Sequence, residues 1–592
     1  MRNLTDDEIG LLEEQGCCAE DWLQVLVSDD FTPDSLHNVT FYGLVEIGSF
    51  LDSMEIEEGF VRRTGIRDVV LRNVTVGDNC LIEHVAGHLS NCDIGANSYI
   101  ANVGIITSNA PSFGIGNEVA VLNEGGDPNV VMTDVLTAQL AFLMIQNASV
   151  YDLVKRETTA RPLPQRTLIG EHVRITFTRE ITNVIIGDYS EIQGSSRLVN
   201  TTLVSTGESS TYVGSDVILE NSIVAAGASV VDGAKVDNCF VGESTYLGKG
   251  FSATNSLFFA NGHFENGEAC AAFCGPFSAS HHKSTLLIGG MFSFFNAGSG
   301  TNQSNHAYKM GPVHWGVLDR GSKTASGCHI LWPARFGAFT MVMGKVSNHP
   351  DLRQLPFSYV IGEAGQTVVV PGVNFTTLGT WRDIHKWKKR DLRLMHQRHD
   401  LIEYAFPNPH IICQVQAGKA LLEQIEREQG VDQEEYDYNG CVISRKSLLR
   451  GMRYYDMAVR VFLHQMLEWD MQQRCLDTGV DEWLDLSGLP APRKEVERLL
   501  ADVKSRVVDT IDDVLLTLDR ILDDYHGHAA GYAQSFIQKE EGDMFFDMEK
   551  WQHEAETAYN QWVSLIRKDA EKEFALGDVS EHAFRQLLEE IK

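Results

Sequence analysis

The stretch "VGSDVILENSIVAAGASVVDGAKV", residues Val213 to Val236, repeats a pattern every six residues. Each block of six begins with an aliphatic or small residue, and Gly, Asp or Asn follows shortly after it. An amphipathic helix would space its apolar residues by three and four, and a hairpin strand would alternate every two. A period of six instead predicts short strands separated by tight turns, with Gly, Asn or Asp at the corners.

The same phrase recurs elsewhere in the chain, as "VGDNCLI" at Val76, "IGANSYI" at Ile94, "IGEHVRI" at Ile169, "IGDYSEI" at Ile186 and "VGESTYLGKGF" at Val241. In these blocks the sequence resembles the hexapeptide-repeat transferase superfamily, which implies a left-handed parallel β-helix with three blocks per coil. The likeness is strong over Ile66–Ile100 and Ile169–Phe251 and looser from Ser252 to about Gly379. An antiparallel all-β fold with similar turns is the alternative, but six consecutive blocks in phase favour the β-helix. The inward residues are then predicted to include Val213, Leu219, Val236 and Val241.

The changes of pattern predict three regions: an N-terminal cap over 1–51, the β-helix over 52–379, and an α-helical domain over 380–592. A helical insertion is expected at about 103–165, because "TDVLTAQLAFLMIQNASVYDLVKRE" starts with a cap signal and contains helix-forming residues. Heptad-like seams predict long C-terminal helices, one carrying Leu448, Met452, Tyr455, Val459, Phe462 and Met466, and another carrying Val496, Leu500, Val503, Val507, Ile511, Val514, Leu518 and Ile521. The fold class is therefore a β-solenoid plus α, and this arrangement is similar to a bacterial family of unknown function.

Composition limits the classes of function. The chain has 592 residues, 43% of them hydrophobic, and a formal charge of −32, which opposes a broad nucleic-acid surface. The N-terminus lacks the apolar core of a signal peptide, and "VLTAQLAFLMI" is too short to span a bilayer. The 11 cysteines show no paired zinc spacing. We expect a soluble cytoplasmic protein that binds neither nucleic acid nor membrane.

Residues 280–351 are rich in His, Lys and Arg and almost free of carboxylates. In so acidic a chain, this composition predicts a local positive patch for a small anionic substrate, since cationic donors form charge-assisted hydrogen bonds with phosphate or carboxylate. The alternative is that these groups satisfy buried backbone or pair with acidic residues. The predicted substrate-binding residues of this patch are His281, His282, Lys283, Lys323, Arg335, Lys345 and His349.

The stretch "NQSNHAYKMG", Asn302 to Gly311, lies within this patch and is similar to the N-H-x-x-Y-x-G stretch in the acetyltransferase half of the bifunctional enzymes that make UDP-N-acetylglucosamine. That likeness implies a catalytic base, His306, and substrate contacts at Asn302, Asn305, Tyr308 and Lys309, although Tyr308 stands one position early. It implies an acyltransferase that uses acyl-CoA, with acetyl-CoA favoured, and acts on a sugar phosphate or nucleotide sugar. Acyl transfer needs a base and donors for the developing oxyanion, and imidazole has a suitable pKa.

Two alternatives stay open. One is a non-catalytic β-helix scaffold or sugar-nucleotide-binding protein, because a fold does not fix a function. The other is a zinc enzyme similar to hexapeptide-repeat carbonic anhydrases, which needs three converging histidines such as His306, His314 and His329. Since these histidines would converge only through loops, we expect no metal.

A basic segment, "WRDIHKWKKRDLRLMHQRH", opens the helical domain at Trp381. Its functional interpretation is a clamp for the phosphates of CoA or a nucleotide, formed by Lys386, Lys388, Lys389 and Arg390. Its structural interpretation is a seam against the acidic body of the chain. The family resemblance further implies a homo-oligomer, with a trimer favoured.

Overall fold

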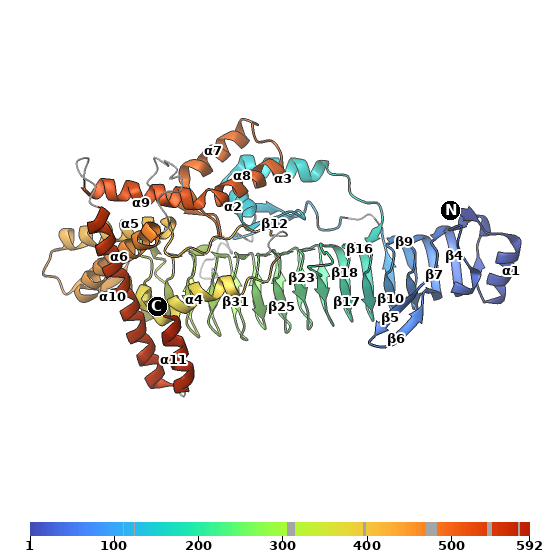
Figure 1. Cartoon of the computed structure of the whole chain (residues 1–592), viewed down its shortest axis with the longest axis horizontal. Helices are drawn as coiled ribbons and strands as arrows, with labels where there is room; N and C mark the ends of the chain where they lie inside the picture. Colours follow the sequence, from blue (N-terminus) through green and yellow to red (C-terminus); the bar gives the residue numbers. More distant parts are fainter. Residues whose placement is uncertain are drawn as a thin grey trace.

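The computed structural model describes residues 1–109, 112–123, 125–304, 314–394, 398–468, 482–541, 548–577 and 580–591. Its main feature is one parallel β-solenoid, in which 41 of the described strands form a single continuous sheet. The solenoid runs along the long axis, with the N-terminus at one end and most helices gathered at the other (Figure 1). The predicted parallel β-helix with helical additions is confirmed.

The period of the coil is visible in the strand pairing. Strand β20 (Ile218–Glu220) pairs in parallel with β23 (Lys235–Asp237), and β23 pairs with β26 (Ser252–Thr254). Leu219 is level with Val236 and Val236 with Ala253, so one coil takes 17 residues and carries three short strands. The residues predicted to point inward, Val213, Leu219, Val236 and Val241, are all buried.

Asparagines at the coil corners explain how so tight a turn is repeated. Asn183, Asn200, Asn221 and Asn238 all have φ between 50° and 56°, the left-handed region in which Asn is one of the few tolerated residues. Their side chains also form a ladder, because the Nδ2 of Asn183 donates to Asn200 at 2.9 Å and that of Asn200 donates to Asn221 at 3.1 Å. The Gly, Asn and Asp signal in the repeats therefore marks the corners.

A short helix covers the N-terminal end of the solenoid. Helix α1 (Asp6–Glu14) is capped by Thr5, whose hydroxyl accepts from the backbone N–H of Glu8 in a capping box. Strand β4 (Leu36–Ile47) already pairs in parallel with β7 (Gly65–Val76). The parallel ladder therefore includes residues on both sides of position 52, where the sequence predicted the boundary between the cap and the β-helix.

The insertion leaves the solenoid after β11 (Ile105–Thr107) and returns at β14 (Thr167–Ile169). It contains a hairpin, β12 (Glu118–Ala120) and β13 (Asn129–Val131), and two helices, α2 (Ala138–Gln146) and α3 (Ala148–Ala160). Asn147 separates the helices, since its side chain accepts from the backbone N–H groups of Ser149 and Val150 and so caps α3. The insertion packs against two C-terminal helices, α7 (Arg493–Lys504) and α8 (Ile511–Asp523). Helix α3 contacts both of them, and α2 contacts α8 (Figure 1).

The C-terminal region is helical, as predicted, but one predicted helix is wrong. The helices after the solenoid are α4 (Leu378–Lys389), α5 (Pro409–Gln429), α6 (Arg445–Glu468), α7 (Arg493–Lys504), α8 (Ile511–Asp523), α9 (Tyr525–Glu541), α10 (Met548–Leu576) and α11 (Glu581–Glu590). The seam predicted from Val496 to Ile521 is broken between α7 and α8, where Val507 is 73% exposed. The break has a local cause, because the hydroxyl of Thr510 caps the first turn of α8.

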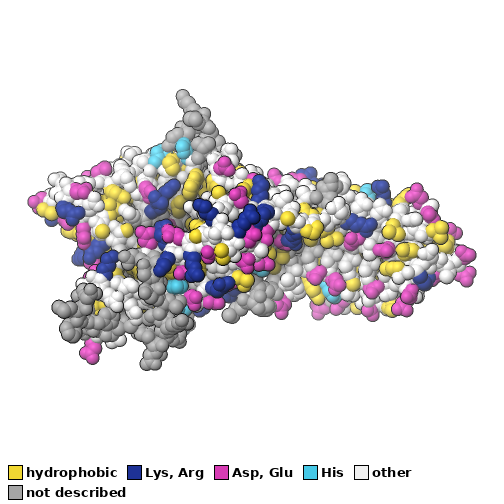
Figure 2. Space-filling view, turned by 90° about the horizontal axis from the view of Figure 1, so that it is seen from above, with side chains coloured by type: hydrophobic (Ala, Val, Ile, Leu, Met, Phe, Trp, Pro, Cys, Tyr) yellow, Lys and Arg dark blue, Asp and Glu magenta, His cyan; other side chains and the backbone are white. Residues whose placement is uncertain are grey.

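Charged side chains cover the outer surface. Figure 2 shows acidic side chains along the whole length of one face, while basic side chains gather over the wider part, where the helices lie. Among the helices that the structure describes, none is long and apolar enough to cross a lipid bilayer.

Candidate functional site

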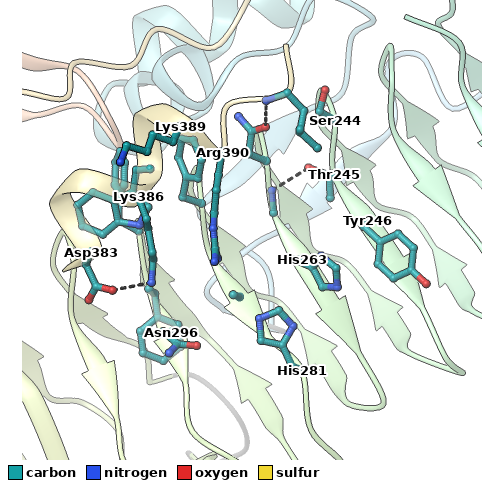
Figure 3. A pocket seen from close by; sticks show the side chains of 18 of the residues that line it. Ser244, Thr245, Tyr246, His263, His281, Asn296, Asp383, Lys386, Lys389 and Arg390 are labelled. Atoms are coloured by element: carbon teal, nitrogen blue, oxygen red, sulfur yellow. Dashed lines mark hydrogen bonds and ion pairs between the residues drawn. The ribbon is translucent and has the colours of Figure 1, made fainter. Parts of the chain in front are cut away.

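A groove of about 700 Å³ lies between one face of the solenoid and helix α4. Its floor is formed by successive coils: β22 (Ser229–Val230), β25 (Tyr246–Gly248), β28 (His263–Glu265), β31 (Ala279–Ser280), β34 (Asn296–Ala297) and β37 (Lys323–Thr324). Figure 3 shows the basic side chains of α4 on one side of this groove and Tyr246, His263 and His281 on the other.

The floor is a row of equivalent positions in consecutive coils. Tyr246 is level with His263 and Ala279 with Asn296, because β25, β28, β31 and β34 pair in parallel. Neighbouring parallel strands lie about 4.8 Å apart, so outward side chains at one coil position stand beside each other. The rings of Tyr246 and His263 stack accordingly, with centroids 4.6 Å apart. Residues far apart in sequence thus form one surface.

Helix α4 is fixed to the solenoid by its apolar side. Thr377 caps its first turn, and Trp381 and Trp387 are buried. The ring of Trp387 contacts Phe294 of the solenoid at 4.6 Å between centroids. With the two tryptophans buried, the basic residues of the helix that face the groove are Arg382, Lys386 and Lys389, followed by Arg390.

The groove carries an excess of positive charge. Asp383 is the one carboxylate among its lining residues. Five cationic side chains line it: Lys323, Arg382, Lys386, Lys389 and Arg390. Asp383 is 3% exposed and is already bound, because Lys386 lies 2.5 Å from one oxygen and Lys323 contacts the other. Within the described residues, no carboxylate pairs with Arg382, Lys389 or Arg390. These three cations are therefore available to an anionic ligand.

One end of the groove holds two histidines and a glutamate. His263 Nε2 lies 3.1 Å from Glu265 Oε1, and the other oxygen of Glu265 accepts from Lys249 Nζ at 2.7 Å. The His281 ring lies 4.7 Å from that of His263. Partial desolvation at the groove and the neighbouring His263 lower the pKa of His281, although its side chain is exposed on one side. Burial raises the pKa of Glu265, but its bonds with Lys249 and His263 outweigh that effect and lower it.

The structure brings together five of the predicted site residues from two separate stretches of sequence: His281, Lys323, Lys386, Lys389 and Arg390. The other predicted residues do not line this groove. His282, Lys283 and Lys388 are exposed beside it, while Asn302, Arg335, Lys345 and His349 lie on or next to other strands of the coils. The predicted base His306 and its neighbours Asn305, Tyr308 and Lys309 lie outside the described residues.

Sequence reasoning missed several residues of the groove, chiefly Ser229, Tyr246, His263, Asn296 and Arg382. The signal that could have found four of them is the coil period. Ser229 pairs with Tyr246 and Tyr246 with His263 at a spacing of 17 residues. The row continues to Ala279 after 16 residues, to Asn296 after 17, and to Lys323 after a longer coil of 27. Aligning the repeats coil by coil would have placed these polar side chains in one row.

A second cavity, of about 540 Å³, contains Arg335, which lies over the ring of Trp315 at 5.2 Å. Its other charged groups are paired within the protein: His410 lies 3.2 Å from Asp319, and Arg353 binds Asp351. This cavity therefore offers fewer free charges to an ionic ligand than the groove beside α4.

One family model matches the part of the chain that contains this groove. A family described as a domain of unknown function, DUF4954, matches residues 1–426, which include the solenoid, α4 and every residue of the groove. The chain belongs to this family. A second family, the domain of unknown function DUF6819, matches residues 468–584 in the C-terminal helical region.

One relative among curated proteins is an uncharacterized protein of Treponema pallidum (strain Nichols), 26% identical over 379 residues. The match covers 60% of this chain and 52% of the relative, so the chain spans about half the length of that protein. Of the predicted resemblance, the parallel β-solenoid is confirmed by the structure, and the predicted family of unknown function agrees with the matched family.

Proposed function

We propose that the protein binds a small phosphorylated molecule, a sugar phosphate or a nucleotide sugar, in the groove between α4 and the solenoid. The observation that carries this proposal is the set of three cations, Arg382, Lys389 and Arg390, that face the groove without a carboxylate partner among the described residues. Ionised donors form short, strong hydrogen bonds with phosphate oxygens. In a chain with a formal charge of −32, such a local excess of positive charge also concentrates an anion where it is bound.

The dimensions and lining of the groove favour a small ligand over a polymer. A volume of about 700 Å³ lies within the range of about 300–1,000 Å³ that small-molecule sites occupy. The acidic remainder of the chain opposes an extended polyanion. The floor adds the ring of Tyr246 and the amide of Asn296, groups suited to the face of a base or to the hydroxyls of a sugar.

Acyl transfer from acyl-CoA to this ligand is the reaction we propose to test first. Its support is the β-solenoid fold together with a groove fitted to a phosphorylated acceptor. The groove contributes acceptor binding to this proposal, while the base implied by the sequence, His306, lies outside the described residues. Binding without turnover, as in a sugar-nucleotide-binding protein, is the alternative that the same experiments separate.

The binding step is tested by thermal unfolding with a panel of sugar 1-phosphates and UDP-sugars, each beside its unphosphorylated sugar. A ligand that binds only the folded protein stabilises it by about 2.7 kcal/mol at 100 times its Kd. Only the phosphorylated members should raise Tm. The double variant Lys389→Gln/Arg390→Gln should bind them at least about tenfold more weakly, since each lost bond to a charged group contributes about 1.5–3 kcal/mol.

Lys388→Gln is the matched control, because Lys388 lies on the same helix but does not line the groove. The proposal is wrong if no phosphorylated ligand shifts Tm, or if the control weakens binding as much as the double variant. Turnover is then measured by mass spectrometry after incubation of the bound ligand with acetyl-CoA. An acetylated product establishes acyl transfer, and an unchanged ligand that still raises Tm establishes binding alone.

A further inference from the structure

We infer that His263, Glu265 and His281 form a site for one divalent transition-metal ion of the zinc type, at the end of the groove. This differs from the prediction of no metal that we made from the sequence. It does not rest on the phosphate ligand proposed above, because the two proposals use different side chains.

The solenoid itself makes the three side chains converge. His263 and Glu265 are two residues apart in strand β28, so both point outward, while Phe264 between them is fully buried. Strand β28 pairs with β31 so that Phe264 is level with Ser280. The next residue, His281, therefore stands beside Glu265 on the neighbouring coil. Two adjacent coils supply all three donors, and no flexible loop is needed.

The spacing of the donor atoms suits an ion. One nitrogen of each histidine and one oxygen of Glu265 all lie within 4.8 Å of one another. His263 Nε2 and Glu265 Oε1 are 3.1 Å apart. Two ligands at zinc distances of about 2.0–2.2 Å in a tetrahedron stand about 3.3–3.6 Å from each other. Binding therefore needs only small movements of these side chains, and the ion takes the place of the hydrogen bond between His263 and Glu265.

The donor set also fits the chemistry of zinc. Two imidazoles and one carboxylate leave a fourth position open, as in catalytic zinc sites, and imidazole suits zinc, copper, nickel and cobalt. Neighbouring residues hold the ligands in place, because Lys249 binds Glu265 Oε2 and leaves Oε1 facing His263, and Tyr246 stacks on the His263 ring. Such outer contacts orient metal ligands.

The open coordination position of the ion faces the groove. His263 and His281 line the same groove as Arg390, whose side chain reaches toward the His281 ring (Figure 3). An anionic group held by Arg390 lies next to the open place on the ion. Because Lys249 and Arg390 add positive charge around it, an anion in the groove should tighten the binding of the metal.

The test uses the full chain without an affinity tag, treated with a chelator and then titrated with Co²⁺ and Zn²⁺ alone. We expect one ion per chain by elemental analysis, visible absorption bands from four-coordinate Co²⁺, and displacement of Co²⁺ by Zn²⁺. Loss of an outer contact typically weakens metal binding about 10- to 100-fold. Loss of a direct ligand in His263→Ala, Glu265→Gln or His281→Ala should therefore weaken it by more than about 100-fold.

His282→Ala is the matched control, since His282 is an exposed histidine next to His281 that is not one of the three ligands. It should bind Co²⁺ as the natural sequence does. The site is refuted if the natural protein takes up no stoichiometric Co²⁺, or if His281→Ala binds it unchanged. His281 is exposed, so this variant should keep its fold, which circular dichroism checks. Because the titration contains no phosphate compound, its failure would leave the proposed phosphate site untouched.

Discussion

The basic segment from Trp381 to His399 contains two halves of similar composition, of which one is exposed in the groove and the other is buried among carboxylates. In the first half, helix α4 holds Lys389 and Arg390 at the surface, where they line an open groove. In the second half, Arg393 is only 6% exposed and lies among carboxylates of the solenoid and of its own segment. The groove and this buried cluster are separated by only a few residues of chain.

The buried cluster consists of Arg393, Asp391, Glu243 and Asp400. Arg393 binds both oxygens of Asp391 at 2.9 and 3.0 Å, lies 3.2 Å from Glu243, and donates to the backbone carbonyl of Asp400 at 2.6 Å. The Asp400 side chain accepts from the backbone N–H groups of Ala138 and Ala260. The cluster thus ties the insertion, the solenoid and the segment after α4 together. Basic residues become structural where carboxylates surround them and stay available where none do.

The largest effect should follow from replacing the buried arginine. Arg393→Met removes the buried cation that Glu243 and Asp391 share, and leaves Asp391 with only the partly exposed Arg398 as a cationic partner among the described residues. Breaking a buried ion pair on one side costs about 3–5 kcal/mol. Thermal or urea unfolding should show this loss. Arg390→Met, three positions earlier but in the groove, should change the free energy of unfolding by less than about 0.5 kcal/mol. Equal losses in the two variants would erase the distinction between the halves.

A smaller effect should appear in the pH dependence of stability. Burial and the charge of Glu243 raise the pKa of Asp400 to about 6. The folded state then holds this proton more tightly than the unfolded chain, whose aspartate pKa is about 3.9. The resulting stabilisation is complete below about pH 4 and is lost as pH rises through about 6. It amounts to something on the order of 3 kcal/mol.

Asp400→Asn should remove this part of the pH dependence, because Asn does not titrate. The Tm of the natural sequence should therefore fall relative to that of the variant as pH rises from 4 to 7. The measurement is a pH series of thermal unfolding curves. Asp30→Asn, at an exposed carboxylate, provides the control and should follow the natural profile. A constant difference in Tm between Asp400→Asn and the natural sequence at every pH would show that Asp400 does not titrate in this range.

The smallest effect on stability is expected in the groove. Lys389→Gln/Arg390→Gln removes two exposed charges that have no carboxylate partner among the described residues, and such surface changes stay within about 0.5 kcal/mol. Tm without ligand should match that of the natural sequence, even though ligand binding is lost. A drop in Tm comparable to that of Arg393→Met would mean that these cations serve the fold.

Much of the fold could be predicted because its signals are local. The six-residue repeat assigned Val213, Leu219, Val236 and Val241 to the interior, and all four are buried. A short strand and a tight corner are specified within each block, so the inference needs no distant information. The prediction of a single helix across Val507 was wrong. The apolar spacing continues through this region, but the local cap at Thr510 starts a new helix.

The candidate site could be predicted only in part. Composition pointed to His281, Lys323 and the basic residues around Lys389, and the structure brings these together. Composition did not indicate that His263 and Tyr246 lie on the same surface as these residues. Nor did it indicate that Arg393 is structural whereas Arg390 lines the groove. Those outcomes depend on neighbours that are remote in sequence.

The amino-acid sequence by itself determined the coil, its corners, its inward residues and the existence of basic stretches in an acidic chain. Only the tertiary structure decided which of these basic residues face an open groove. The register between coils brings residues 17 positions apart side by side, and the docking of α4 joins Lys323 to Asp383. Charge and coordination depend on the distance between side chains in space, and that distance is set only when coils stack and helices pack upon them.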